Sequence, residues 1–293
     1  MIEIVSVGSS SAGNSYIIRA GEAVLLLDAG LSARKIVSAL DDCGLSPEDV
    51  DAVLITHEHI DHVRSIRAIA GKCCNAEVYA SSGTIAGCDN FCYVPEERLN
   101  IVCRGDSFIV SGKDSEAKSP MVRCFALSHD AREPIGYSII CDGEQLTVVT
   151  DTGIITDEIF GEMKTADMLV FEANHEEQML MYGPYPYNVK QRIKSDYGHL
   201  SNVTAGEILA SLIRERLDAC KEASEEEGPA YNTAPEIMLA HLSDKNNTPY
   251  QARLTIEDIL HSNGYERDEH YSLSIAAREG LTGMKTRKPD SDE

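Results

Sequence analysis

Apolar residues in this chain fall in short runs that predict an alternation of strands and helices. Apolar runs bounded by Gly, Asp or Ser indicate buried strands, and apolar residues at helical spacing indicate helices. The predicted strands are residues 3–7, 15–18, 24–28, 52–55, 77–80, 122–127, 136–141, 146–150, 168–171, 236–240 and 271–276, and the predicted helices are 33–43, 61–70, 203–223 and 251–262. This order predicts an α/β fold in which two sheets pack face to face with helices outside.

The chain shows no composition break strong enough to divide it, so we predict one domain over residues 1–283. We expect the polar segment 284–293 to be a disordered tail. Residues 221–235 are acidic and then rich in Gly, Pro and Ala, which predicts a mobile loop between a helix and a strand.

Composition narrows the class of protein. Hydrophobic residues make up 43% of the chain, but no apolar run reaches the roughly 18 residues of a membrane span. The first residues do not resemble a signal peptide, so we expect a cytoplasmic protein. The nine cysteines are scattered, which suits a reducing compartment. We interpret Cys73-Cys74 and the pair Cys88 and Cys92 as structural thiols, with a separate zinc site as the alternative. A net charge of −22 argues against broad electrostatic binding of nucleic acid, although it leaves room for a local basic track.

The densest group of polar side chains is Thr56-His57-Glu58-His59-Ile60-Asp61-His62, between a predicted strand and a predicted helix. His57 and His59 can point the same way on extended chain, while Asp61 and His62 fan out toward a second point. Imidazoles and carboxylates are ligands that suit zinc, so one loop can serve two metal ions. The alternative is a solvated loop in which Asp61 is a plain helix N-cap.

Two metal ions need more donors than one loop supplies. His129, Asp151 and His241 each follow an apolar strand, where loops gather at one rim of a sheet. Singly, each is more typical of a turn residue with satisfied hydrogen bonds. Together with the opening motif, and in this order, they indicate a metal site.

The order and context of these residues resemble the metallo-β-lactamase-fold hydrolases over residues 1–280. The resemblance implies a four-layer αββα sandwich, with the site at one edge of the two sheets. It also implies two divalent metal ions, zinc in the first place and manganese as the other option. The ligands that it implies are His57, His59 and His129 for the first ion, Asp61, His62 and His241 for the second, and Asp151 between them.

Within that superfamily, residues 8–14, 27–32, 171–175, 198–202 and 241–247 resemble the YycJ/WalJ group. That group is similar in its metal site to the nucleases tRNase Z and RNase J. It lacks the cap domain of the RNase J branch, and this chain has no stretch long enough to hold one. The resemblance implies cleavage of phosphodiester bonds in DNA or RNA.

Cleavage of a phosphodiester leaves a sugar alkoxide, which needs a proton. His199 lies ahead of a long predicted helix, as the proton-donating histidine of tRNase Z does, and Glu172 is the expected partner that orients its ring. We predict catalytic roles for His199, Glu172 and Asp61. The alternative is that His199 is a helix-entry residue and Glu172 a surface carboxylate.

Further polar and aromatic residues are candidates for contact with substrate. The predicted substrate contacts are Asn174, His175, Ser201, Asn246 and Asn247. The basic residues Arg132, Lys190, Arg192 and Lys194, with Tyr182, Tyr185 and Tyr187, are candidates for a basic groove on which a single strand stacks. An ordinary solvated face is the alternative.

Four other functions share parts of this pattern. A β-lactamase is disfavoured because no cysteine lies between Cys141 and Cys220, where that branch places its thiol ligand. A glyoxalase II-like thioester hydrolase shares H-x-H-x-D-H, but it would not require the pair of Glu172 and His199. A phosphodiesterase of small molecules and a regulatory binding protein without catalysis stay open. The sequence does not fix the oligomeric state.

Overall fold

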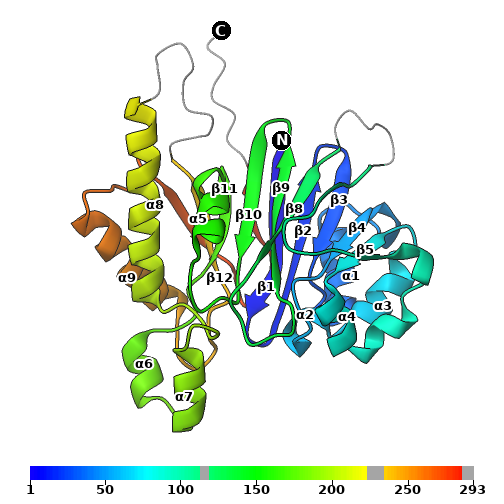
Figure 1. Cartoon of the computed structure of the whole chain (residues 1–293), viewed down its shortest axis with the longest axis horizontal. Coiled ribbons are helices and arrows are strands. Elements are labelled where there is room, and N and C mark those ends of the chain that lie inside the picture. The colour runs from blue at the N-terminus through cyan, green and yellow to red at the C-terminus, as the bar shows by residue number, and fades with distance from the viewer. Residues whose placement is uncertain (113–118, 223–233, 286–293) are drawn as a thin grey trace.

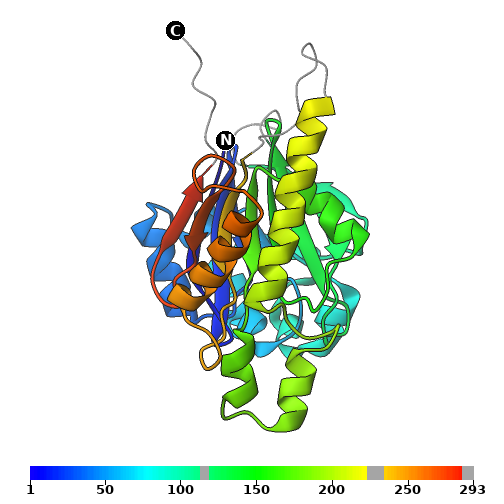
Figure 2. The same cartoon turned by 90° about the vertical axis from the view of Figure 1, so that its left-hand side faces the viewer.

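Two β-sheets packed face to face form the centre of the molecule (Figure 1). A computed structural model of the chain describes residues 1–112, 119–222 and 234–285. Within those residues each sheet has seven strands, and helices cover both outer faces (Figures 1 and 2). The predicted four-layer αββα sandwich is confirmed.

The first sheet has the strand order β14-β1-β2-β3-β4-β5-β6. Its strands are β1 (Ile2–Ser10), β2 (Gly13–Ala20), β3 (Ala23–Leu27), β4 (Ala52–Leu54), β5 (Glu77–Ala80), β6 (Leu99–Ile101) and β14 (Thr282–Lys285). The pairs from β14 to β3 are antiparallel and those from β3 to β6 are parallel. Parallel strands are covered on both faces, which explains why β3 is an unbroken apolar run.

The second sheet has the strand order β13-β12-β11-β10-β9-β8-β7. Its strands are β7 (Ser107–Ile109), β8 (Met121–Ala126), β9 (Ile135–Cys141), β10 (Glu144–Val149), β11 (Met168–Glu172), β12 (Glu236–Ala240) and β13 (Ser272–Ile275). The strands from β10 to β13 pair in parallel, and those from β10 to β7 pair antiparallel. Each sheet therefore has a parallel half and an antiparallel half.

Helices form the outer layers. They are α1 (Ala33–Asp42), α2 (Ile60–Val63), α3 (Ile66–Lys72), α4 (Ser82–Gly87), α5 (Asp157–Lys164), α6 (Glu177–Tyr182), α7 (Tyr187–Ile193), α8 (Asn202–Glu222) and α9 (Pro249–Ser262), with 3-10 turns η1 (Pro47–Asp49), η2 (Asp89–Tyr93) and η3 (Glu96–Arg98). α1 and α3 pack on the first sheet through one apolar layer, and α5, α8 and α9 pack on the second sheet through another. None of the helices in the described ranges is long and apolar enough to cross a membrane.

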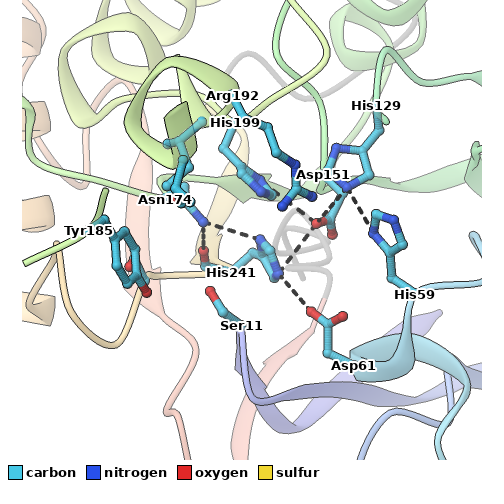
Figure 3. Close-up of a pocket in the computed structure, with 13 residues that line it drawn as sticks. Ser11, His59, Asp61, His129, Asp151, Asn174, Tyr185, Arg192, His199 and His241 are labelled. Carbon is cyan, nitrogen blue, oxygen red and sulfur yellow. Dashed lines mark hydrogen bonds and ion pairs between the residues drawn. The ribbon is translucent and has the colours of Figure 1, made fainter. Parts of the chain in front are cut away.

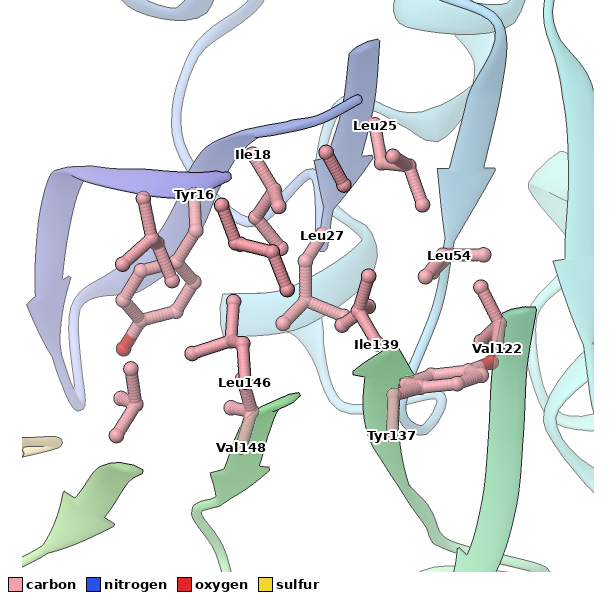
Figure 4. Close-up of a cluster of buried hydrophobic side chains, with 14 of the residues drawn as sticks. Tyr16, Ile18, Leu25, Leu27, Leu54, Val122, Tyr137, Ile139, Leu146 and Val148 are labelled. Atoms are coloured by element: carbon pink, nitrogen blue, oxygen red, sulfur yellow. The ribbon is translucent and has the colours of Figure 1, made fainter. Parts of the chain in front are cut away.

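The central core lies between the two sheets (Figure 4). Leu25 and Leu27 of the first sheet and Ile139 and Leu146 of the second are fully buried there. The hydroxyl of Tyr137 donates a 2.8 Å hydrogen bond to a carbonyl of the first sheet, that of Ile55, so this core contains a specific link as well as apolar contact.

Several sequence predictions are changed by tertiary contacts. The predicted helix 61–70 divides into α2 and α3, because the amide of Ser65 donates to the carbonyl of Ala29 (2.9 Å) instead of continuing the helix. The predicted strands 3–7 and 15–18 are longer than expected, since β1 extends to Ser10 and β2 begins at Gly13. The short strands β6, β7 and β14 and the helices α4 to α7 were not predicted.

Two predicted segments fall largely outside the described residues. The predicted tail 284–293 begins inside β14, where Met284 pairs with Ile4 of β1. The rest of that tail, from residue 286, and residues 223–233 of the predicted loop 221–235 lie outside the described ranges.

The carboxyl ends of the parallel strands of both sheets meet at one edge. Asp28 follows β3, His57 follows β4, Asp151 follows β10 and His241 follows β12, and Glu172 is the last residue of β11. Loops at the carboxyl ends of parallel strands are the usual place for a site in α/β folds. This edge is therefore where the candidate chemistry lies.

A close approach of backbones holds α2 against the end of β3. The amide of Ala29 donates to the carbonyl of His62 (2.7 Å), and a Cβ on Gly30 would lie 1.5 Å from the carbonyl oxygen of Asp61. We expect Gly30→Ala to lower the free energy of unfolding by about 1–3 kcal/mol, because backbone has to shift. Gly161→Ala, at an open position of α5, should raise it by about 0.4–1 kcal/mol. Urea denaturation of the metal-free variants measures both, and equal values would contradict the close approach.

Candidate metal centre

Three residues at the site edge have left-handed backbone conformations. The φ angles of Asp28, Asp151 and His241 are 58°, 60° and 54°. A residue other than glycine rarely adopts positive φ, and where it does the strain is held by the surrounding structure. Each of these residues lies one or two positions after a buried strand, so the conformation turns the chain where a polar side chain faces the site.

The first group of donors comprises His57, His59 and His129, whose ligand atoms all lie within 4.8 Å of one another. Nδ1 of His59 is 3.2 Å from Nε2 of His129. His57 is completely buried, whereas the side chain of His59 is 31% exposed. The group therefore has one open side, toward the pocket shown in Figure 3.

The second group comprises Asp61, His62 and His241, within the same limit. Oδ2 of Asp61 lies 3.6 Å from Nε2 of His62 and 3.5 Å from Nε2 of His241. α2 places Asp61 and His62, and the end of β12 places His241. Residues almost 180 positions apart in the chain thus converge on one point.

Asp151 lies between the two groups (Figure 3). Its Oδ1 is 3.7 Å from Nε2 of His129 and 3.4 Å from Nε2 of His241, and its Oδ2 is 3.2 Å from Nε2 of His62. The side chain is 3% exposed. One carboxylate is therefore within reach of donors from both groups.

Buried atoms without hydrogen-bond partners show that this cluster suits a cation. Among the described residues, Nε2 of His57, Nε2 of His241 and Oδ2 of Asp151 have no hydrogen-bond partner. Neighbouring polar atoms lie close by without the alignment of a hydrogen bond. Leaving such atoms without hydrogen bonds costs about 1–3 kcal/mol each, and divalent ions at the two groups would satisfy all three. Imidazole nitrogen and carboxylate oxygen are the donors that such ions accept.

The opposite ring nitrogen of each buried histidine is held from behind. Nδ1 of His57 is 3.1 Å from the hydroxyl of Thr56, and Nδ1 of His129 is 3.2 Å from the carbonyl oxygen of Gly198. Contacts of this kind fix the tautomer and the ring orientation of a metal-binding histidine. They leave Nε2 facing the cluster.

Asp28 holds His62 in the same way. Its Oδ2 lies 2.7 Å from Nδ1 of His62, and its Oδ1 accepts a 2.9 Å hydrogen bond from the amide of Thr56. The β1–β2 hairpin supports His241, because the hydroxyl of Ser9 in β1 accepts a 2.8 Å hydrogen bond from the amide of His241. The β1–β2 hairpin and the end of β3 are thus built into the site.

Glu172 supports two histidines at once. Its Oε1 is 2.7 Å from Nδ1 of His199 and 3.0 Å from Nδ1 of His241, and its Oε2 accepts the amide of Thr152 at 3.1 Å. Glu172 is completely buried, so it is not a surface carboxylate. It links the ligand candidate His241 with the pocket residue His199.

Burial and neighbouring charges favour the ionisation states that bind metal. Burial and the charge of His62 lower the pKa of His57 well below its usual value. Burial opposes ionisation of Asp151, but His241 and His62 lower the pKa of its carboxyl well below the usual range. Burial likewise opposes ionisation of Glu172, and His199 and His241 nevertheless lower its pKa to about 2.

His62 and His241 shift in the opposite direction. Burial disfavours their charged forms, yet Asp28 and Asp151 raise the pKa of His62 well above its usual value, and Asp151 is the main cause that raises the pKa of His241 to about 10. Protons on these rings balance the carboxylates. A divalent cation would replace that balance, with release of protons.

The predicted substrate contacts are not all at the pocket. Asn174 lines it, and its side chain also donates to the carbonyl of His241 (2.9 Å). The other four are buried and lie outside the pocket lining, and they are His175, Ser201, Asn246 and Asn247.

These four side chains have other surroundings. The hydroxyl of Ser201 accepts from the amide of Thr204 at the start of α8, and the side chain of Asn247 donates to the carbonyl of Ala173 (2.8 Å). Burial lowers the pKa of His175 to about 4. Their role as substrate contacts has no support in this geometry, which instead gives Ser201 and Asn247 structural bonds.

Sequence reasoning assigned no role to Asp28, Glu58 or Asp130. Asp28 carries the same signal as Asp151, a carboxylate directly after an apolar strand, and could have been found by it. Glu58 and Asp130 carry no such signal. Glu58 accepts a hydrogen bond from the amide of Arg132, and Asp130 accepts one from Arg192, and these partners come close only in the folded chain.

Comparisons with known proteins identify the family and the fold of this chain. A family model described as a β-lactamase superfamily domain matches residues 24–218. Exodeoxyribonuclease YycJ of Bacillus anthracis is 32% identical over 266 residues, covering 90% of this chain and 91% of that protein. Exodeoxyribonuclease WalJ of Streptococcus pneumoniae is 34% identical over 255 residues, covering 86% of each.

The crystal structure of the metallo-β-lactamase fold protein YhfI from Bacillus subtilis has the same fold. Its TM-score is 0.66 at 15% identity, with 97% of this chain and 100% of that chain covered. The chain therefore belongs to the β-lactamase superfamily and, within it, to the YycJ/WalJ group.

Glu58 ties together the two loops that carry the first group of histidines. Its Oε1 accepts a 2.8 Å hydrogen bond from the amide of Arg132, three residues beyond His129. We expect Glu58→Ala to weaken metal binding by about tenfold, the lower end of the range for contacts that orient ligands. Competition with a chromogenic chelator measures the Zn²⁺ affinity. The control is Glu215→Ala, which removes an exposed carboxylate paired with Lys164. Equal Zn²⁺ affinities of the two variants would contradict the proposed effect of the Glu58–Arg132 hydrogen bond on metal binding.

Proposed function

We propose that this protein is a metal-dependent nuclease that hydrolyses phosphodiester bonds with two divalent ions. The observation that carries the proposal is the convergence of seven donors on two adjoining groups at one sheet edge, with Asp151 between them. The proposed ligands are those implied by the sequence, namely His57, His59 and His129 for one ion, Asp61, His62 and His241 for the other, and Asp151 for both.

Zinc is the metal that we propose, with manganese as the second choice. The donor set is rich in imidazole and contains carboxylates, which suits zinc. Divalent ions held in this way supply Lewis acidity and lower the pKa of a bound water. The residues of the chain fix the geometry, because three side chains, those of Thr56, Asp28 and Glu172, hold the histidine rings from behind.

His199 is the proposed proton donor to the leaving oxygen. It lines the pocket, and its Nδ1 is paired with Glu172, so Nε2 is the nitrogen left to act on substrate. A buried carboxylate at Nδ1 fixes the orientation of the ring, so that Nε2 can deliver a proton at a fixed place. A thioester hydrolase would not require this pair, which favours a phosphodiester whose leaving group is a poor one.

DNA is the first substrate to test, since two relatives of this chain carry the name exodeoxyribonuclease. We expect cleavage of labelled oligodeoxynucleotides with Zn²⁺ or Mn²⁺. Cleavage of no strand, single or double and DNA or RNA, with either metal would exclude the proposed function.

Asp151 is the residue whose loss should affect both ions. We expect Asp151→Ala and Asp151→Asn to abolish strand cleavage and to lower the metal content of a folded protein, measured by elemental analysis. Asn is the cleaner change because it tolerates the left-handed backbone at this position. Asp142→Asn, at an exposed turn that also has positive φ, is the control. Near wild-type turnover in a folded Asp151→Asn protein would exclude the two-ion assignment.

His199→Ala should slow departure of a poor leaving group far more than that of a good one. General acids contribute about 10²–10⁴-fold, so we expect strand cleavage to fall by that range. Hydrolysis of bis(p-nitrophenyl) phosphate should fall much less, because nitrophenolate leaves without a proton. His261→Ala, at an exposed histidine of α9, is the control. Equal losses with both substrates would mean that His199 supports metal binding or folding instead.

A further inference from the structure

A helical arm projects from the sandwich beside the candidate metal centre. We define the α6–α7 arm as residues 177–193, which comprise α6, α7 and their connection. Figures 1 and 2 show it standing clear of both sheets at the edge that carries the site. The chain enters it three residues after Asn174 and leaves it six residues before His199, both of which line the pocket.

The arm is braced rather than loose. Nζ of Lys190 in α7 donates to the carbonyls of Met181 and Gly183 at the end of α6, at 2.8 Å each. At its exit the amide of His199 donates to the carbonyl of Ile193 (2.9 Å). Gly198 permits this approach, since a Cβ there would lie 2.2 Å from the same carbonyl oxygen. The arm and the proposed proton donor are therefore held in a fixed relation.

The inner side of the arm forms one wall of the pocket. Tyr185, Val189, Arg192 and Ile193 line it together with His59 and His129, and Figure 3 shows Tyr185 on the side of the pocket away from these two histidines. The guanidinium of Arg192 makes two hydrogen bonds to Asp130, one of them 2.9 Å from Nη2 to Oδ1. The side chain of Arg192 remains 54% exposed, so its guanidinium is held in place by Asp130 and still has N–H groups open to the pocket.

The tip of the arm exposes aromatic rings. Tyr182 is 86% exposed and Tyr187 is 77% exposed, and both lie close in sequence to the pocket residue Tyr185. Lys190, which the sequence suggested as a basic groove residue, is instead engaged in bracing the arm. The arm therefore offers exposed rings near its tip and a pocket wall that carries Arg192.

We propose that the α6–α7 arm binds the unpaired nucleotides that flank the scissile phosphate, with Tyr185, Tyr187 and Tyr182 stacking on successive bases and Arg192 contacting a phosphate. The inference rests on the proposed function and assigns it a single-stranded substrate. A chain of net charge −22 gains little from broad electrostatic attraction. Stacking on aromatic rings works without it, and bases paired within a duplex do not offer their faces.

Binding without metal tests the arm separately from catalysis. The probe is a fluorescein-labelled oligothymidine of about 12 nucleotides, within the range of known single-strand sites, followed by anisotropy in EDTA. Stacking is worth about 1–3 kcal/mol per base, and 1.4 kcal/mol is tenfold in affinity. We expect the double variant Tyr182→Ala/Tyr187→Ala to bind at least about tenfold more weakly than wild type.

Two controls make the result specific. Tyr93→Ala removes an exposed tyrosine of η2 outside the arm, where Arg67 covers its ring, and should bind the strand as wild type does. With metal present, the double variant should lose strand cleavage through a higher KM and keep its hydrolysis of bis(p-nitrophenyl) phosphate. This small ester reaches the metal centre without the arm.

Three results would overturn the proposal. The first is unchanged affinity of the double variant for the strand. The second is equal loss with a blunt duplex of the same length. The third is a wild-type dimer that the double variant converts to monomer at unchanged strand affinity, which would mean that the rings cover a second copy. If wild type cleaves no substrate but the anisotropy result holds, the proposed function fails and the arm remains a single-strand site.

Discussion

The cost of burying polar atoms without partners is the constraint on which this structure depends. At the edge where both sheets end, Nε2 of His57, Nε2 of His241 and Oδ2 of Asp151 are buried and make no hydrogen bond among the described residues. Apolar packing of the two sheets and their helices has to offset that cost and the strain of positive φ at Asp151 and His241. A divalent cation would remove most of it, so the folded chain is better matched to the metal-bound state than to the metal-free one.

The supporting contacts explain how so many donors face one point. Asp28 and Glu172 are buried carboxylates that touch His62, His199 and His241 from behind. Because each carboxylate comes at the end of a different parallel strand, the sheets themselves set the distances between the histidine rings. The precision of the site therefore comes from the sheets, while the short loops contribute the side chains.

The negative charge of the chain affects the binding of both cations and nucleic acid. Carboxylates concentrated at the site raise the pKa values of His62 and His241 and would hold cations tightly. The same charge disfavours binding of nucleic acid over a broad surface. A braced arm with exposed tyrosines beside a paired arginine provides contacts that do not depend on net charge.

The sequence alone determined the sandwich, its longer strands and helices, and the set of candidate donors, because periodicity and residue type are local properties. It nominated His57, Asp151 and His241 as metal ligands and paired Glu172 with His199; the structure brings these residues together, and their roles stay predictions. Tertiary structure alone decided the break between α2 and α3, the short strands β6, β7 and β14, and the α6–α7 arm. Only the tertiary structure shows that Ser201 and Asn247 lie outside the pocket lining, and that Asp28 contacts His62 and Glu58 contacts the amide of Arg132. Those features depend on hydrogen bonds between residues far apart in the chain, which exist only once the two sheets have packed.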